Sequence, residues 1–213
     1  MLKDLIIIGA GGVGREAALI VEDINNISKE WNLLGFIDDN KNIKGENING
    51  YNVLGGLENI INYEKEVYVV CAIANYEIKK SIIEKILRSN PKIKFANLIH
   101  PTVNLNKTVK LGNGCIIYQG NIITANINIG NHVIISPKCG IGHDSVINDY
   151  CSLLWNVNIS GNVKLEEGVT MGSGSTIIQG KKIEQGSFIG AGAVVIEDIK
   201  PFSKAVGIPT RYI

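Results

Sequence analysis

The C-terminal half of the chain carries an aliphatic residue or methionine at every sixth position. The series begins at Ile99, ends at Val195 and contains seventeen positions without a miss or an insertion. Since 45% of all residues are hydrophobic, chance would produce this series in one chosen register about once in a million. The pattern therefore indicates a structural repeat of six residues.

An uninterrupted period of six is typical of a parallel β-helix. An α-helix buries residues that are three and four apart, and a hairpin strand alternates with a period of two and breaks at each turn. In a β-helix every short strand ends in a sharp corner, and three strands complete one triangular coil of about eighteen residues. The length of the series predicts about five coils.

A second position of the repeat, two residues before each member of the series, is mostly small or β-branched. It holds Cys115, Cys139 and Cys151. We therefore interpret these cysteines as reduced core residues and not as metal ligands or disulfide partners. Glycines that directly follow the series, such as Gly112, and abundant asparagines indicate corners with left-handed backbone angles.

The N-terminal part has a different pattern, in which apolar strands alternate with helices. Residues 5–9 predict a buried strand, which leads into the glycine turn G-A-G-G-V-G and a helix that begins near Arg15. Residues 33–37 and 67–74 predict two further strands. One apolar face of a second helix is predicted from Ile78, Ile82, Ile83, Ile86 and Leu87. This order makes one βαβαβ half of a dinucleotide-binding fold.

The glycine turn is a candidate ligand site. Strand, glycine turn and helix in this order leave bare backbone amides and a helix N-terminus to receive a phosphate. Asp38 and Asp39 end the second strand, at the right distance downstream to meet a ribose or sugar hydroxyl. A purely structural turn is the alternative. The joint occurrence of the glycine turn and the two aspartates favours a ligand site. Because only one half of a dinucleotide-binding fold is present, a nucleotide or nucleotide sugar is favoured over NAD.

Among the three histidines, His143 is the candidate for catalysis. It lies two residues after Ile141, at a corner of the predicted coil, and directly before Asp144. A carboxylate beside the ring orients it and increases its basicity, as a general base near neutral pH requires. An isolated histidine on a surface turn more often has no function. We interpret His100 and His132 as structural.

Composition and charge exclude several classes of function. The net charge of +1 provides no basic face for nucleic acid. No apolar run is long enough to span a membrane, and no cleavable signal is indicated, so we expect a cytoplasmic protein. The histidine spacing differs from that of β-helical zinc enzymes, and we expect no bound metal.

Taken together, the motifs resemble the sialic-acid O-acetyltransferase and nucleotide-aminosugar N-acetyltransferase family over essentially the whole chain. The resemblance rests on the GAGGxG loop, Asp38-Asp39, Asn97-Leu98-Ile99-His100, His143-Asp144, Ser160-Gly161-Asn162-Val163 and Val206-Gly207-Ile208-Pro209. It implies a Rossmann-like α/β half-domain at residues 1–96, followed by an all-β left-handed parallel β-helix at residues 97–213.

The resemblance also implies an activity, the transfer of an acetyl group from acetyl-CoA to a sugar in a homotrimer whose active sites lie between neighbouring β-helices. His143 would accept the proton of the acceptor, Asp144 would increase its basicity, and the backbone N–H of Gly161 would stabilise the oxyanion. Contacts with CoA fall on Ser152, Gly161, Ser173 and Ala191. Contacts with the acceptor fall on Gly11, Gly12, Val13, Asp38, Asp39 and Ala74. Val13 and Ser152 stand where better-known members carry histidines.

The expected reaction is N-acetylation of a UDP-linked 4-amino-4,6-dideoxy sugar for surface glycan synthesis, because the glycine loop offers a place for a pyrophosphate. O-acetylation of free sialic acid is the first alternative, and it would leave that loop without a pyrophosphate. A non-catalytic β-helix scaffold is the second alternative. An NAD-dependent oxidoreductase is disfavoured, because only half of a dinucleotide fold is present.

Overall fold

A computed structural model describes residues 2–213. The chain forms two compact units, one that ends at Ile99 and one that comprises His100–Ile213. This division lies three residues beyond the end of the half-domain expected at residue 96. No helix among residues 2–213 is long and apolar enough to cross a membrane.

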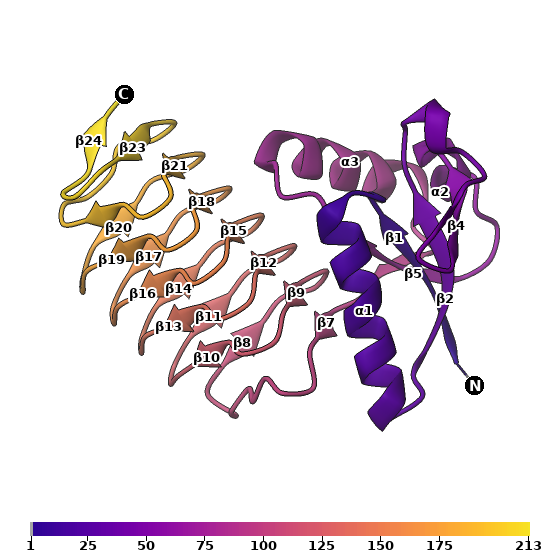
Figure 1. Cartoon of the computed structure of the whole chain (residues 1–213), viewed down its shortest axis with the longest axis horizontal. Helices are drawn as coiled ribbons and strands as arrows, with labels where there is room; N and C mark the ends of the chain where they lie inside the picture. The colour runs from indigo at the N-terminus through magenta and orange to yellow at the C-terminus, as the bar shows by residue number, and fades with distance from the viewer. Residues whose placement is uncertain (1) are drawn as a thin grey trace. The chain divides into compact units, whose positions relative to one another are not determined.

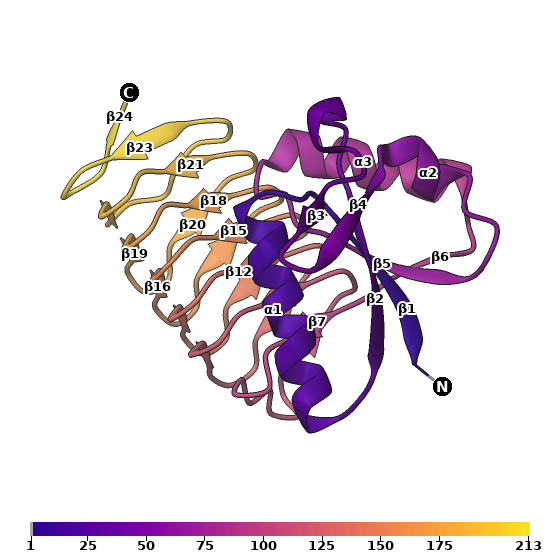
Figure 2. The same cartoon turned by 45° about the vertical axis from the view of Figure 1, so that its right-hand side comes forward.

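The first unit is built on a six-stranded sheet with the order β3-β4-β2-β1-β5-β6 (Figure 2). Its strands are β1 (Lys3–Ile8), β2 (Trp31–Ile37), β3 (Asn47–Ile48), β4 (Tyr51–Gly55), β5 (Val67–Cys71) and β6 (Ile93–Phe95). Its helices are α1 (Gly12–Ile27), the 3-10 helix η1 (Lys41–Ile43), α2 (Leu57–Ile61) and α3 (Tyr76–Ser89). A further short strand, β7 (Leu98–Ile99), ends the unit.

Strands β1, β2 and β5 correspond to the three predicted strands, and they pair in parallel with β1 in the centre. Strand β4 extends the parallel sheet beside β2, and β6 extends it beside β5. Strands β3, β4 and β6 were not predicted. For β3 and β6 the reason is that runs of two and three residues are too short to carry a periodic pattern.

The glycine turn connects β1 closely to α1. The helix begins at Gly12, earlier than the predicted start near Arg15, with Gly11 as its N-cap. A Cβ on Gly14 would overlap the carbonyl oxygen of Gly9, and Gly9 itself has a φ of +98°. These two glycines are therefore required by the close packing of helix on strand.

Helix α3 buries only part of the predicted face. Ile83 and Ile86 are completely buried, but Ile78 and Leu87 are 52% and 57% exposed. Lys79 lies in the core instead. The predicted apolar stripe was therefore wrong at Ile78 and Leu87, the residues near the two ends of the helix.

The second unit stacks two-residue strands into the three sides of a triangular coil (Figure 1). One side contains β10 (Ile122–Ile123), β13 (Gly140–Ile141), β16 (Asn158–Ile159), β19 (Thr176–Ile177) and β22 (Val194–Val195). The next contains β8 (Lys110–Leu111), β11 (Asn128–Ile129), β14 (Val146–Ile147), β17 (Lys164–Leu165) and β20 (Lys182–Ile183). The third contains β9 (Ile116–Ile117), β12 (Ile134–Ile135), β15 (Ser152–Leu153), β18 (Thr170–Met171), β21 (Phe188–Ile189), β23 (Lys204–Val206) and β24 (Arg211–Tyr212).

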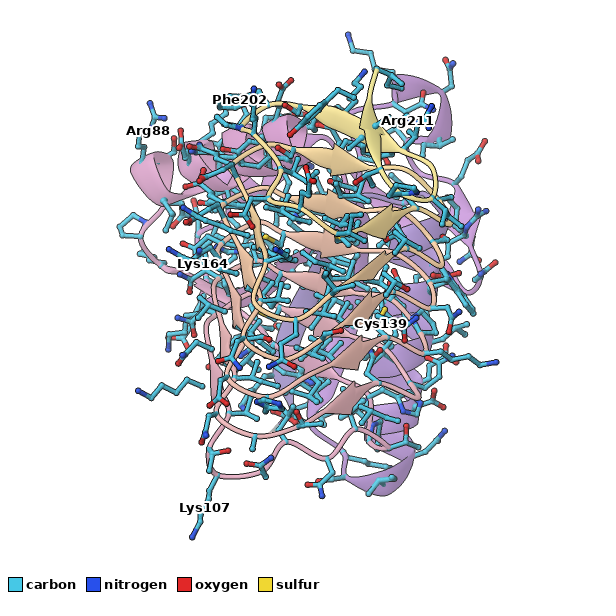
Figure 3. All side chains as sticks on the ribbon, turned by 90° about the vertical axis from the view of Figure 1, so that its left-hand side faces the viewer. Arg88, Lys107, Cys139, Lys164, Phe202 and Arg211 are labelled. Carbon is cyan, nitrogen blue, oxygen red and sulfur yellow. The ribbon has the colours of Figure 1, made fainter. Side chains whose placement is uncertain are left out.

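The core of the second unit is the predicted six-residue series. All members from Ile117 to Val195 are buried, which confirms the repeat. Cys115, Cys139 and Cys151 are buried in the small position, as predicted. Burial raises the pKa of the Cys139 thiol to about 11, so this thiol stays protonated and unreactive. Figure 3 shows Cys139 within the coil and Lys107 extending away from it.

The left-handed corners lie at a different position of the repeat than expected. A positive φ recurs at every sixth residue from Gly114 to Gly192, three residues after each member of the series, and Asn126 is one of these residues. The glycines that directly follow the series have no positive φ. A Cβ on Gly142 would lie 2.6 Å from the backbone of the next coil. Glycine there allows successive coils to approach closely, so its predicted role in left-handed corners was wrong.

Candidate active site

His143 and Asp144 form a hydrogen-bonded pair on the corner that follows β13. Nδ1 of His143 lies 2.7 Å from Oδ2 of Asp144, and the two side chains are 55% and 44% exposed. A carboxylate can only accept a hydrogen bond, so the neutral imidazole carries its proton on Nδ1. Nε2 is then left with a lone pair, as a general base requires.

Asn126 holds the other oxygen of the Asp144 carboxylate. It lies one coil earlier on the same corner, and its Nδ2 donates to Oδ1 of Asp144 at 3.0 Å. The hydrogen bonds from His143 and Asn126 keep the pKa of Asp144 below its ordinary value. The sequence interpretation missed Asn126, although its distance of eighteen residues from Asp144 was a sufficient signal.

Gly161 lies one coil after His143, directly against the imidazole ring. A Cβ on Gly161 would lie 2.6 Å from Nε2 and 2.7 Å from Cε1 of His143, so only glycine leaves room for the ring. Among residues 2–213, no acceptor is found for the backbone N–H of Gly161. This N–H is therefore available to an oxyanion near Nε2.

Two of the residues expected to contact CoA lie together on another corner. Ser173 follows β18 and Ala191 follows β21, one coil later, and both are exposed. Trp155, one coil before Ser173, is 46% exposed on the same corner. These residues form an accessible column along one edge of the triangle. That edge differs from the one with His143, so a single β-helix does not bring the two groups together.

Ser152 is different from the other expected CoA contacts. It lies within strand β15 and not at a corner, and it is completely buried. A side chain that no solvent molecule reaches cannot contact a diffusible ligand. The expected contact of Ser152 with CoA is therefore not supported by the structure.

The residues expected to contact the acceptor lie together at one edge of the first unit's sheet. Gly11, Gly12 and Val13 follow β1, Asp38 and Asp39 follow β2, and Ala74 lies shortly after β5. Because β2, β1 and β5 are parallel neighbours, the three loops meet at the carboxyl ends of the strands. Ligands of open α/β sheets bind at this edge.

The two aspartates hold the loops at this edge. Asp38 accepts hydrogen bonds from the backbone N–H groups of Ala10 and Asn40, both at 2.9 Å. Oδ1 of Asp39 accepts from the N–H of Leu57 at 2.8 Å. No partner for Oδ2 of Asp39 is found in the described part of the chain. Asp38 is thus largely a structural residue, and Asp39 has an oxygen available for a ligand hydroxyl.

A cavity of about 430 Å³ opens beside these aspartates. Lys41, Lys44 and Lys85 line it together with Asp38, Asp39 and Glu58. The three lysines come from η1, the loop after it and α3. They belong to no motif, and the sequence interpretation missed them because only the fold brings them together. Each of the three ammonium groups can pair with a phosphate oxygen, while the three carboxylates of the lining make the cavity neutral as a whole.

A smaller, mostly apolar cavity of about 160 Å³ lies next to the first one and shares Asp38 and Asp39 with it. Its other lining residues are apolar or glycine: Ile8, Gly9, Ile37, Leu57, Ile73, Ile78 and Ile82. This cavity explains why Ile78 is not packed in the core. A flat ring of a ligand would have an apolar surface to contact there.

Within residues 2–213, no three His, Cys, Asp or Glu side chains are grouped closely enough to hold a metal ion.

Comparisons with known proteins show what the chain is similar to in sequence and in fold. Residues 4–86 match the family model of the PglD N-terminal domain. The chain is 29% identical over 175 residues to GDP-perosamine N-acetyltransferase of Escherichia coli O157:H7. The matched segment covers 82% of this chain and 77% of that protein.

Two solved structures have the same fold over nearly their whole length. The acetyltransferase domain of PglB from Neisseria gonorrhoeae FA1090 has a TM-score of 0.89 at 24% identity and covers 99% of this chain and 100% of its own. PerB from Caulobacter crescentus, solved with CoA and GDP-perosamine, has a TM-score of 0.86 at 23% identity and covers 100% of this chain and 98% of its own.

These similarities confirm the predicted fold class, an α/β half-domain followed by a left-handed parallel β-helix. Residues 4–86 of the chain therefore match a PglD N-terminal domain, and the chain as a whole is similar in sequence to a GDP-perosamine N-acetyltransferase and in fold to acetyltransferases with a β-helix.

Proposed function

We propose that the protein transfers the acetyl group of acetyl-CoA to the amino group of a nucleotide-linked 4-amino-4,6-dideoxy sugar, a step in surface glycan synthesis. The observation that carries this proposal is the His143–Asp144 pair, whose imidazole lies against Gly161. A base and an unused N–H donor next to each other are what aminolysis of a thioester needs.

The reaction follows from these groups. The sugar amine attacks the carbonyl carbon of the thioester while Nε2 of His143 accepts the proton that the nitrogen loses. The carbonyl oxygen becomes an oxyanion, to which the N–H of Gly161 donates. The C–S bond then breaks, and His143 returns the proton to the leaving thiolate. The products are the acetamido sugar and CoA. Asp144 stabilises the imidazolium between the two proton transfers.

A nucleotide-linked acceptor is favoured by the glycine turn. A Cβ on Gly11 or Gly12 would meet no atom within 4 Å, and neither residue has a positive φ. The fold therefore does not require glycine at these two positions, in contrast to Gly9 and Gly14. Close approach of a ligand to the backbone is a reason for their presence. The lysines of the neighbouring cavity supply charge for a diphosphate.

A homotrimer is part of this proposal. His143 and the column of Ser173 and Ala191 lie on different corners of one β-helix, and a neighbouring copy would bring the second column to the first. Active sites between subunits would then account for both groups. We also propose that the protein acts in the cytoplasm, where acetyl-CoA and nucleotide sugars are made. Sedimentation in the presence of CoA tests the trimer directly.

The experiment that tests the proposal measures the release of CoA with UDP- and GDP-linked 4-amino-4,6-dideoxy sugars, GDP-perosamine among them, and with free sialic acids. Turnover of a nucleotide amino sugar supports it. Turnover of sialic acids alone would assign the protein to O-acetylation instead. In an active enzyme, His143→Ala should lower kcat at least about a hundredfold. An unchanged phenotype of cells that carry His143→Ala would favour a non-catalytic scaffold.

A further inference from the structure

The peptide group between Ser160 and Gly161 has two ends with different surroundings. Its N–H, from Gly161, is the donor that the proposed reaction uses. Its C=O, from Ser160, accepts a hydrogen bond from the hydroxyl of Ser145 at 3.1 Å. Ser145 is completely buried, so the carbonyl oxygen points into the coil. In a trans peptide the N–H points in the opposite direction, away from Ser145.

The orientation of the Ser145 hydroxyl is fixed by a second hydrogen bond. The backbone N–H of Val163 donates to Oγ of Ser145 at 3.2 Å. Because this N–H occupies a lone pair of the oxygen, the hydroxyl proton is directed to the carbonyl of Ser160. A hydrogen bond at the carbonyl also polarises the peptide and makes its N–H a stronger donor.

Packing alone does not require serine at position 145. The same small position of the repeat holds aliphatic side chains in other coils, such as Val133, Val157 and Val163, all of which are buried. Ser175 occupies this position as well, and its buried hydroxyl has no hydrogen-bond partner within residues 2–213. A donor at this position reaches the carbonyl fifteen residues later in some coils only, from Ser145 and from Cys115, Cys139 and Cys151, and Ser145 is the one that reaches the peptide before Gly161.

The orientation of the peptide between Ser160 and Gly161 also requires a restraint. Gly161 is required by the His143 ring, and a glycine allows the peptide before it to rotate more freely than any other residue does. Hydrogen bonds on either side restrain the neighbouring residues, from Ser160 N–H to Ile177 and from Asn162 N–H to His143. Ser145 is the side chain that restrains the plane of the peptide itself.

We propose that Ser145 is a positioning residue for acetyl transfer, which holds the Ser160 carbonyl inside the coil so that the Gly161 N–H faces the developing oxyanion. The inference rests on the proposed function, since it assigns the Gly161 N–H to the oxyanion. Ser145 itself touches neither substrate. Its loss should therefore affect the chemical step and leave the binding of both substrates nearly unchanged.

The test compares three variants. Ser145→Ala removes the hydroxyl, and Ser145→Cys keeps a donor, because Cys139 and Cys151 make the corresponding contact with backbone carbonyls. Ser187→Ala is the matched control. The Ser187 hydroxyl is equally buried, donates to the carbonyl of Lys200 at 2.7 Å and accepts from a backbone N–H. No expected site residue contributes to that contact.

We expect Ser145→Ala to lower kcat about tenfold with both KM values within about twofold. Ser145→Cys should recover most of the rate, and Ser187→Ala should lower the melting temperature to a similar extent with no loss of kcat. Equal kcat in Ser145→Ala and Ser187→Ala would overturn the inference. A loss of kcat in Ser145→Cys as large as that in Ser145→Ala would overturn it as well.

A spectroscopic measurement separates this inference from the proposed function. In ligand-free protein labelled with 15N-glycine, the amide resonance of Gly161 should shift in Ser145→Ala and not in Ser187→Ala. If wild-type protein acetylates no nucleotide sugar, the proposed function fails whatever this resonance does. If wild-type protein is active and the resonance does not shift, only the role of Ser145 is overturned.

Discussion

Nδ2 of Asn126 donates a hydrogen bond to Oδ1 of Asp144 across one coil of the β-helix, at 3.0 Å. Asn126 therefore fixes the carboxylate that orients His143. We expect Asn126→Gly to lower kcat about fivefold, because Asp144 loses one of its two restraints. Glycine is chosen because Asn126 has a positive φ, which glycine adopts without strain. Steady-state kinetics check the prediction.

The control for Asn126→Gly is Asn49→Gly. Asn49 also has a positive φ and is exposed, and it lies in the turn between β3 and β4, outside the expected sites. The exchange tests the effect of a new glycine at a left-handed position without touching Asp144. A similar loss of kcat in both variants would show that the new glycine, and not the lost hydrogen bond to Asp144, matters.

A methyl group on Gly161 should displace the imidazole of His143. The Cβ of an alanine would lie 2.6 Å from Nε2, much closer than side-chain atoms pack. We expect Gly161→Ala to lower kcat at least about a hundredfold, a loss comparable to that of the base itself. A crystal structure of the variant should show the ring rotated away from Asp144.

Gly140→Ala provides the comparison for Gly161→Ala. Gly140 lies in β13, close to His143 in the chain, and its Cβ would meet only Oδ1 of Asn158 at 3.6 Å, an ordinary contact. The rate of this variant should be that of the wild type. If Gly161→Ala also keeps the wild-type kcat, the imidazole of His143 does not depend on the missing side chain at position 161.

The glycine turn allows packing and ligand binding to be tested separately. We expect Gly14→Ala to lower the free energy of unfolding by about 3 kcal/mol, because its Cβ overlaps the carbonyl of Gly9. Gly12→Ala should leave the stability unchanged and raise the KM for the nucleotide sugar about tenfold, since its Cβ enters open space. Urea denaturation and substrate titration distinguish the two. A wild-type KM in Gly12→Ala would remove the argument for a ligand at this turn.

The six-residue repeat could be predicted from Ile117 to Val195 because each of these members sees the same environment as its neighbour one coil away. Ile135 pairs with Leu153 in the next coil, and both are buried for the same reason. A local pattern therefore determines the global arrangement of the second unit. The position of His143 on an exposed corner followed from that register and is confirmed by the structure.

Features that depend on contacts between distant segments could not be predicted in this way. Lys44 and Lys85 reach one cavity only because α3 and the loop after η1 lie at the same end of the sheet. Ser152 is buried although its neighbours in the chain include exposed corner residues. Ile78 lines a cavity and not the core. A local pattern of apolar residues does not state which segment covers a face.

The ion cluster around Glu166 should make the stability of the β-helix dependent on pH. Oε1 of Glu166 lies 2.8 Å from Nζ of Lys164 and 2.9 Å from Nζ of Lys182, and Asn148 donates to Oε2. The hydrogen bond from Lys164, followed by that from Lys182, keeps the pKa of Glu166 below its ordinary value of 4.5. A lowered pKa in the folded state means that the carboxylate stabilises the fold above pH 4.5. That contribution is lost as the pH falls through the pKa of the folded state.

We therefore expect Glu166→Gln to lower the free energy of unfolding by about 1 kcal/mol at pH 7, since the lysines are partly exposed and solvent weakens their interaction with the carboxylate. The difference between variant and wild type should shrink as the pH falls below 4.5, where the wild-type carboxyl group also becomes neutral. Urea denaturation at pH 7 and at pH 3 measures this difference in the free energy of unfolding. Glu184→Gln is the control, because Glu184 pairs with Lys182 alone and is more exposed, so its effect should be smaller. A difference for Glu166→Gln that is the same at pH 7 and pH 3 would mean that its cause is packing and not charge.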